Sequence, residues 1–349
     1  MIRSTKINLK SANTGKLQSL DSILEECNRV INLYIDLYWN QSNLKFAKDK
    51  VDTWLSARLQ QACGKQALEI IRSVRKKKGK NTKPEYKRKS VTLDFRFVNL
   101  IFDENSFDIW IKLTSIGNKI KLFIPSKKHR HFNWYKDNDW TLKNSIRLYK
   151  NSKGYFAELF FEKEQLQKSN GETLALDNGY KKLGALSNGT FIGTDLQYYI
   201  NKISNKTQGS KNFKKALIER NEYINKELKS LFQDNDIKQL IIEDLKNVKY
   251  KSKQNRKIST KFMNKLQRWV YSYIMTRLEQ LAEVIGVQCL RVNPAYTSQT
   301  CSNCGAIDKN SRQGEIYKCK HCGIELDADY NASLNILNLS GQENMVPVS

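Results

Sequence analysis

The sequence has no long apolar segment, and this absence limits the kind of protein it encodes. Across 349 residues, no apolar run approaches the roughly 20 residues that a membrane-spanning helix needs. The first residues, 1–6, lack the apolar core of a secretory signal peptide. We therefore expect a cytoplasmic protein, with enough length for two or three domains that each have a core.

A regular framework of paired cysteines is also missing. The chain has seven cysteines, an odd number, and four of them lie in the segment 301–322. The other three, Cys27, Cys63 and Cys289, lie apart in apolar surroundings. This uneven distribution argues against a disulfide-bonded domain and predicts one metal site together with buried free thiols.

Two cysteine pairs predict that metal site. In Cys301-x-x-Cys304 and Cys319-x-x-Cys322 a glycine follows each second cysteine, and fourteen residues separate the inner cysteines. This spacing is typical of a zinc ribbon, in which four thiolates surround Zn²⁺ tetrahedrally. Because four cysteines leave no open coordination position, we predict a structural zinc and interpret His321 as a bystander.

Acidic residues are scarce relative to basic ones. The sequence has 60 Lys and Arg against 35 Asp and Glu, a formal net charge of +25. Such an excess repels itself unless a polyanion is bound, and Lys and Arg bind nucleic acid by releasing counterions from phosphates. An anionic membrane is the alternative, but it requires a basic amphipathic helix or a lipid anchor, and neither is evident. We expect a nucleic-acid partner and no membrane.

The first half of the chain predicts an all-β domain with a helical insertion. Residues 6–10 and several stretches of 91–163 alternate apolar and polar side chains, as half-buried strands do. Residues 17–39 and 51–74 instead repeat apolar side chains at helical spacing. The segment 72–89, in which ten of eighteen residues are Lys or Arg, is either a nucleic-acid contact or a solvated loop. The expected boundaries are an antiparallel barrel or sandwich at 1–12 and 90–168, and a helical domain at 13–89.

After a boundary near 169–171, strands alternate with helices. The expected strands lie at 173–177, 182–186, 190–193, 239–243 and 288–293, and the expected helices at 212–232, 260–285 and 331–339. This order is that of an RNase H-like (RuvC) sheet. We predict such an α/β domain at 171–298 and 324–340, the zinc ribbon at 299–323, and a disordered tail at 341–349.

Three carboxylates lie where such a sheet places its catalytic groups. Asp177 and Glu243 each end an apolar strand, and Asp329 opens the helix after the ribbon. Converging carboxylates repel one another unless cations are bound, and their oxygens suit Mg²⁺ or Mn²⁺. Two such ions activate a water and stabilise the leaving oxygen of a phosphodiester, so no covalent nucleophile is expected. We predict that these three are catalytic and interpret Asp327 as a flanking surface residue.

With these residues identified, the chain resembles the TnpB family of transposon-encoded, RNA-guided DNA nucleases, relatives of the compact type V CRISPR effectors. The motifs that carry the resemblance are VNPAYTSQTCSNCG at 292–305, YKCKHCG at 317–323 and ADYNASLNI at 328–336. The family's catalytic carboxylates match Asp177, Glu243 and Asp329. The resemblance implies Mg²⁺-dependent cleavage of double-stranded DNA that matches a guide RNA and lies next to a short adjacent motif.

The resemblance also implies that the N-terminal domain is a wedge β-barrel whose inserted recognition helices bind guide RNA and target DNA. The segment 55–68 resembles the second of these helices. Its candidate nucleic-acid contacts are Arg58, Gln61, Lys65 and Gln66, for which an ordinary polar helix face is the alternative. Arg312 resembles a family position near the scissile phosphate, where it would offset developing charge; a solvated loop arginine is the alternative.

Other functions stay open at this point. The segment between Asp177 and Glu243 is shorter than is usual in the family, which leaves guide contacts there undecided. Some family members are catalytically silent RNA-guided DNA-binding repressors, but those lose one or more of the three carboxylates, and this chain keeps them. A transposase that acts without RNA and a type V CRISPR effector are further alternatives. The oligomeric state is not predicted.

Overall fold

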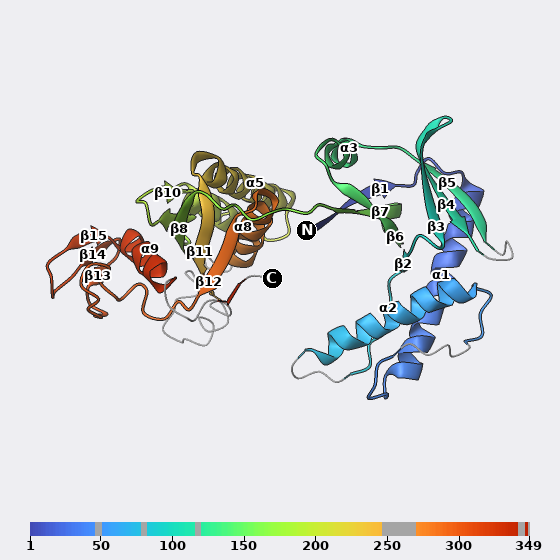
Figure 1. Ribbon diagram of the computed structural model, residues 1–349, viewed down its shortest axis with the longest axis horizontal. Coiled ribbons are helices and arrows are strands. Elements are labelled where there is room, and N and C mark those ends of the chain that lie inside the picture. Colours follow the sequence, from blue (N-terminus) through green and yellow to red (C-terminus); the bar gives the residue numbers. More distant parts are fainter. Residues whose placement is uncertain (46–50, 78–81, 116–119, 246–269, 341–345, 348–349) are drawn as a thin grey trace. The chain divides into compact units, whose positions relative to one another are not determined.

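The computed structural model describes residues 1–45, 51–77, 82–115, 120–245, 270–340 and 346–347. The chain divides into two compact units, Met1–Glu164 and Gln165–Ser349. Most helices and strands of both units are labelled in Figure 1, and each unit is described by itself. Among the described residues, no helix is both long and apolar enough to cross a membrane.

The N-terminal unit contains two antiparallel sheets. The first has the order β1 (Ile2–Asn8), β7 (Gly154–Glu162), β6 (Thr141–Asn151) and β2 (Ser90–Leu93). The second has the order β3 (Val98–Glu104), β4 (Phe107–Thr114) and β5 (Lys121–Ser126). Within the described ranges the strands form these two sheets and not one closed barrel, because a turn at 94–97 ends β2 and starts β3 in the other sheet.

Two long helices follow β1 and bury apolar faces in the core that the sheets share. The helix α1 (Thr14–Tyr38) begins where the side chain of Asn13 accepts a hydrogen bond of 3.0 Å from the Lys16 backbone N–H. The helix α2 (Ala57–Arg75) begins later than the predicted residue 51, because Ser56 is still extended. Among the buried residues of this core are Ile7, Leu20, Leu24, Ile31, Leu59, Cys63, Leu148 and Leu159.

The sequence-based boundaries differ from the structure at two further places in this unit. The first strand begins at Ile2, not near residue 6, because its early residues already pair with β7. A short helix, α3 (Arg130–Asp137), was missed. Its first turn is capped by Nδ1 of His129, which accepts from the backbone N–H groups of His131 and Phe132, and this contact is not visible in an apolar pattern.

The C-terminal unit is built on a six-stranded mixed sheet in the predicted chain order. From one edge to the other the strands are β10 (Phe191–Ile192), β9 (Gly184–Leu186), β8 (Glu172–Asn178), β11 (Ile237–Glu243), β12 (Gln288–Val292) and β16 (Val346–Pro347). The central strands β8, β11 and β12 are parallel, and the remaining pairs are antiparallel. The tail prediction was wrong at β16, because its backbone extends the sheet beside β12.

Helices cover both faces of this sheet. On one face lie α4 (Leu196–Ser204), which was not predicted, α5 (Lys211–Asp234) and α8 (Tyr271–Ile285). The other face packs against α9 (Ala328–Leu339) (Figure 1), which starts earlier than the predicted residue 331. The predicted helix at 260–285 is present as α8, and its residues 260–269 lie outside the described residues.

Between β12 and α9 the chain forms a small three-stranded sheet. Its order is β13 (Arg312–Gln313), β14 (Ile316–Lys318) and β15 (Glu325–Asp327). The cysteine pairs lie in the turns before β13 and after β14. The separate core of this subdomain includes Cys301, Tyr317 and Cys319.

Candidate active site and metal centre

Asp177 and Glu243 lie at the ends of neighbouring parallel strands. In the register of β8 and β11, Leu176 is opposite Ile242, so the two carboxylates follow side by side at the carboxyl edge of the sheet. Side chains alternate along a strand, so Asp177 shares a face with Ala175, and Glu243 shares it with Ile241. Both apolar residues belong to the core under α9, the helix that carries Asp329. The three carboxylates therefore face the same side of the sheet.

The electrostatics of Asp177 show that the three charges act on one another. Burial raises the pKa of Asp177 well above its usual value, and the charges of Glu243 and Asp329 raise it further, while Arg312 and Lys182 oppose the shift. Burial also raises the pKa of Glu243. Buried carboxylates that repel one another are a donor set whose ionised form a divalent cation such as Mg²⁺ or Mn²⁺ would stabilise.

Two cations contact Asp329. Arg312 is one of the candidate nucleic-acid contacts predicted from the sequence, and its Nη2 lies 2.7 Å from Oδ1 of Asp329. Nζ of Lys182 lies 3.3 Å from Oδ2 of the same carboxylate. Lys182 is also 3.2 Å from Asp327 and stacks over the ring of Phe191 at 4.0 Å. Sequence reasoning missed Lys182 because it lies in a turn with no motif of its own, and only the fold brings it to α9.

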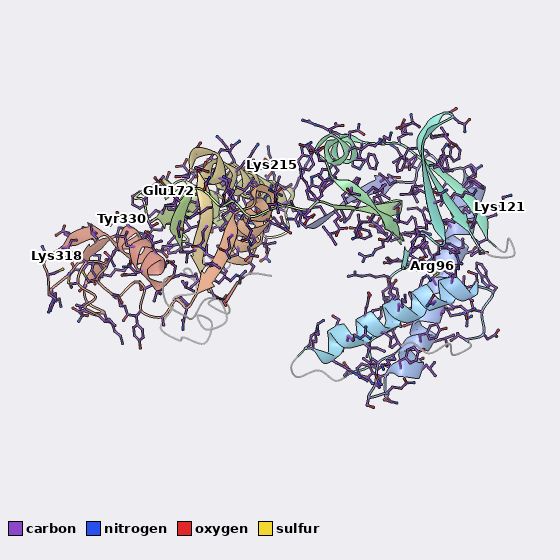
Figure 2. The ribbon with its side chains drawn as sticks, in the orientation of Figure 1. Arg96, Lys121, Glu172, Lys215, Lys318 and Tyr330 are labelled. Carbon is purple, nitrogen blue, oxygen red and sulfur yellow. The ribbon has the colours of Figure 1, made fainter. Side chains whose placement is uncertain are left out.

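Asp327 has a role that the sequence-based interpretation did not assign. It is the N-cap of α9, where its side chain accepts hydrogen bonds from the backbone N–H of Asp329 at 2.9 Å and of Tyr330 at 3.0 Å. Tyr330 is labelled in Figure 2. The N-cap therefore fixes the first turn of α9 and with it the backbone of Asp329. The sequence contained a signal for this role, because an Asp just before an apolar helical run is a typical N-cap.

The four predicted cysteines come together. The Sγ atoms of Cys301, Cys304, Cys319 and Cys322 all lie within 4.8 Å of one another, an arrangement that could hold a metal ion. Two of the separations are 3.6 and 3.7 Å. A tetrahedral ion with bonds of about 2.3 Å to sulfur separates its ligands by about 3.8 Å, so the cluster is compatible with structural zinc.

Backbone N–H groups favour the thiolate at Cys319 and Cys322, whereas burial raises the pKa of Cys301, and the pKa of Cys304 is raised to about 12 although the backbone N–H of Ala306 opposes the shift. A hydrogen bond from the backbone N–H of Ile324 is the main cause that lowers the pKa of Cys322 to about 6. The backbone N–H of Cys322 lowers the pKa of Cys319 in the same way, and His321 also contributes its backbone N–H to that sulfur. The ring of His321 is not part of the cluster, in agreement with its interpretation as a bystander.

In the N-terminal unit, the four predicted contact residues of α2 line one cavity of about 520 Å³. The cavity also contains Arg96, labelled in Figure 2, together with Lys143 and Arg147. Arg58 and Lys65 are exposed. The amide of Gln66 has an internal role, because its Nε2 donates to the Tyr86 hydroxyl at 2.8 Å and its Oε1 accepts from the backbone of Thr92 at 3.2 Å. Arg58 donates one N–H to the carbonyl of Arg96 at 2.9 Å, so of the four predicted residues the remaining donors of Arg58, together with Gln61 and Lys65, can face a ligand.

Comparisons with known proteins place the C-terminal part among nuclease-related sequences. The model of the Cas12f1-like TNB domain family matches residues 271–336. The CRISPR-associated endodeoxyribonuclease Cas12f1 of Sulfoacidibacillus thermotolerans is 42% identical over 96 residues, which are 27% of this chain and 20% of that protein. TnpB-like protein L79 of Acanthamoeba polyphaga mimivirus is 35% identical over 88 residues, 25% of this chain and 17% of that protein. The matches thus span a fifth or less of these relatives' lengths.

The fold resembles that of a solved protein over most of the chain. The structure titled "Cryo-EM structure of the Cas12f1-sgRNA-target DNA complex" matches with a TM-score of 0.56 and 15% sequence identity, covering 95% of this chain and 82% of that chain. At this level of identity the likeness concerns the fold.

Proposed function

The chain is a relative of the TnpB-like proteins and of Cas12f1, and from this relationship we propose that it is an RNA-guided, Mg²⁺-dependent DNA endonuclease. The observation that carries the proposal is the gathering of Asp177, Glu243 and Asp329 on one side of the sheet, close enough that two of them raise the pKa of the third. A purely structural role does not account for three carboxylates that repel one another at a strand edge.

In the proposed mechanism, Asp177, Glu243 and Asp329 would hold Mg²⁺ or Mn²⁺. When bound, these ions supply an activated water and stabilise the leaving oxygen of the phosphodiester. Arg312 and Lys182 flank Asp329 and offset negative charge where a scissile phosphate approaches. Cys301, Cys304, Cys319 and Cys322 would hold Zn²⁺, which would keep the ribbon folded beside α9.

We assign guide RNA and double-stranded DNA as partners. The solved relative was determined as a Cas12f1-sgRNA-target DNA complex, which supports this assignment. In the N-terminal unit, the cavity lined by Arg58, Gln61 and Lys65 provides cations and amides for phosphates and base edges. We assign 1–12 and 90–168 to a wedge domain, 13–89 to a recognition domain, 171–298 and 324–340 to the nuclease domain, and 299–323 to the zinc ribbon.

The test begins with RNA that copurifies with the protein from its native host. Sequencing that RNA supplies a guide, and a DNA duplex that matches it is then incubated with the protein and Mg²⁺. We expect cleavage by the wild type, and none with EDTA or in the Asp177→Ala variant. Cleavage by Asp177→Ala at the wild-type rate would refute the catalytic assignment, and protein free of any discrete RNA would refute the guided one.

The relatives include both TnpB-like and CRISPR-associated proteins, so two biological contexts are compatible with the same chemistry. Of the two, we propose the transposon context of the TnpB family that the sequence resembles. The genes that surround its own gene distinguish this context from a type V CRISPR system.

A further inference from the structure

A loop with a buried threonine lies beside the carboxylate of Glu243. The loop 293–302 leads from β12 into the cysteine cluster, and Thr297 within it is only 4% exposed. The Thr297 hydroxyl lies within hydrogen-bonding distance of Oε1 of Glu243, a residue that is 7% exposed, and 3.1 Å from the Pro294 carbonyl. A hydroxyl has one proton to donate, and a carboxylate is the stronger acceptor. Thr297 therefore orients the Glu243 side chain.

The same loop is fastened to α9 by a buried asparagine. Nδ2 of Asn335 donates to the carbonyl of Thr297 at 2.9 Å and to the carbonyl of Thr300 at 2.7 Å. Asn335 is 6% exposed and lies on the helix that begins with Asp329 in its first turn. A continuous path of hydrogen bonds thus runs from Glu243 through Thr297 to α9.

A second asparagine of α9 reaches the cysteine cluster. Asn331 is fully buried, and its Nδ2 donates to the Thr300 carbonyl at 2.8 Å. Its Oδ1 accepts from the backbone N–H of Ser302 at 2.9 Å, inside the turn that joins Cys301 to Cys304. Two buried side chains of α9 therefore bind three backbone groups of this loop, the carbonyls of Thr297 and Thr300 and the N–H of Ser302.

We propose that Thr297, Asn331 and Asn335 form a positioning brace that sets the Glu243 carboxylate relative to Asp329 and couples the cysteine cluster to both. The inference rests on the proposed function, because it assumes that these carboxylates bind a divalent cation. The brace acts through the ligands and does not touch the substrate. Replacing a residue that orients a metal ligand in this way typically lowers the metal affinity by about 10- to 100-fold.

The test measures Mn²⁺ binding to the full-length, zinc-loaded protein without nucleic acid, from the electron paramagnetic resonance signal of free Mn²⁺. Asp177→Ala identifies the binding that belongs to the carboxylates. We expect Thr297→Val to weaken that binding about tenfold, and Thr297→Ser, which keeps the hydroxyl, to restore it to within about threefold of wild type. Thr207→Val makes the same change at an exposed loop position and is the matched control.

The unfolding temperature separates positioning from a general loss of structure. We expect Thr297→Val to unfold within a few degrees of wild type while its Mn²⁺ affinity falls. If Thr297→Val does not fold, Asn335→Asp replaces the Nδ2 donor at constant size and gives the second comparison. Wild-type Mn²⁺ affinity in Thr297→Val, or in Asn335→Asp where that variant serves, overturns the brace. So does a Thr297→Ser variant as weak as Thr297→Val.

The outcomes also separate the brace from the function on which it rests. A wild-type protein that binds Mn²⁺ at the carboxylates but cleaves no guided duplex refutes the endonuclease and leaves the brace supported by its own variants. If Asp177→Ala binds Mn²⁺ as tightly as wild type, the carboxylates are not the metal site, and both proposals are overturned.

Discussion

At the scale of single residues, the buried carboxylate of Asp177 lowers the stability of the metal-free protein. Its pKa is raised mainly by burial and further by two neighbouring carboxylates, so its ionised form destabilises the metal-free fold. The penalty is absent below the ordinary pKa of an aspartate. It grows as the pH rises from that value through the raised pKa of the folded protein. Function therefore opposes stability at this position.

Asp177→Asn tests this cost. We expect the substitution to abolish cleavage and, in EDTA at neutral pH, to raise the unfolding temperature of the protein by a few degrees, because it removes the buried charge. The gain should shrink as the pH is lowered toward the ordinary pKa of an aspartate. Thermal unfolding followed by circular dichroism at several pH values measures it. If Asp177→Asn is less stable than wild type at neutral pH, the buried carboxylate does not destabilise the metal-free protein, and the prediction is wrong.

Lys182 and Lys181 are neighbours in sequence with different environments. Lys182 is 14% exposed and contacts Asp327 and Asp329, whereas Lys181 is 43% exposed and pairs with Glu315 on the surface. We expect Lys182→Met to lower the cleavage rate about tenfold, because a partly buried cation beside a ligand carboxylate is lost. Lys181→Met, the matched control, should stay within about twofold, since exposed ion pairs contribute little. Equal rates in the two variants would refute a role for Lys182.

At the scale of elements, the cysteine cluster organises a subdomain that has little core of its own. Its strands are two or three residues long, and four buried residues form its apolar centre. We expect Cys304→Ser to release zinc and to unfold the ribbon, because metal binding supplies most of its folding free energy. Zinc release measured with a chromogenic chelator, together with near-ultraviolet circular dichroism, follows the loss. An unchanged unfolding curve after zinc removal would contradict a structural metal.

The elements that sequence reasoning predicted are those with a local signal. Strands β8 and β11 are apolar runs that end in a carboxylate, and the cysteine spacing is a local pattern, so Asp177, Glu243 and the cluster could be identified from the sequence. The Thr297 hydroxyl and the amide of Asn335 form contacts across 54 and 38 positions of the chain. No local pattern encodes such pairs, because they exist only once the sheet and α9 have packed.

At the scale of the whole molecule, positive charge belongs to both units. Met1–Glu164 contains 33 Lys and Arg against 17 Asp and Glu, and Gln165–Ser349 contains 27 against 18, so the net charges are +16 and +9. The excess in the C-terminal unit is present although that unit also contains the proposed carboxylate site. A polyanion that contacts both units would therefore gain from each, which a nucleic acid much longer than either site can do.

This distribution predicts a steep dependence of binding on salt. If the two units together neutralise six to ten phosphates, affinity for a matched duplex should fall by roughly 10³- to 10⁵-fold between 50 and 200 mM salt, because each neutralised phosphate releases counterions. Fluorescence anisotropy with the Asp177→Ala variant loaded with its guide measures this without cleavage. Lys121 and Lys153, which are exposed and do not line the cavity, serve as a control. Their joint replacement by Gln should change the slope less than replacement of Arg58 and Lys65, which line the cavity. A flat response to salt, or equal slopes in the two double variants, would contradict this placement of the phosphate contacts.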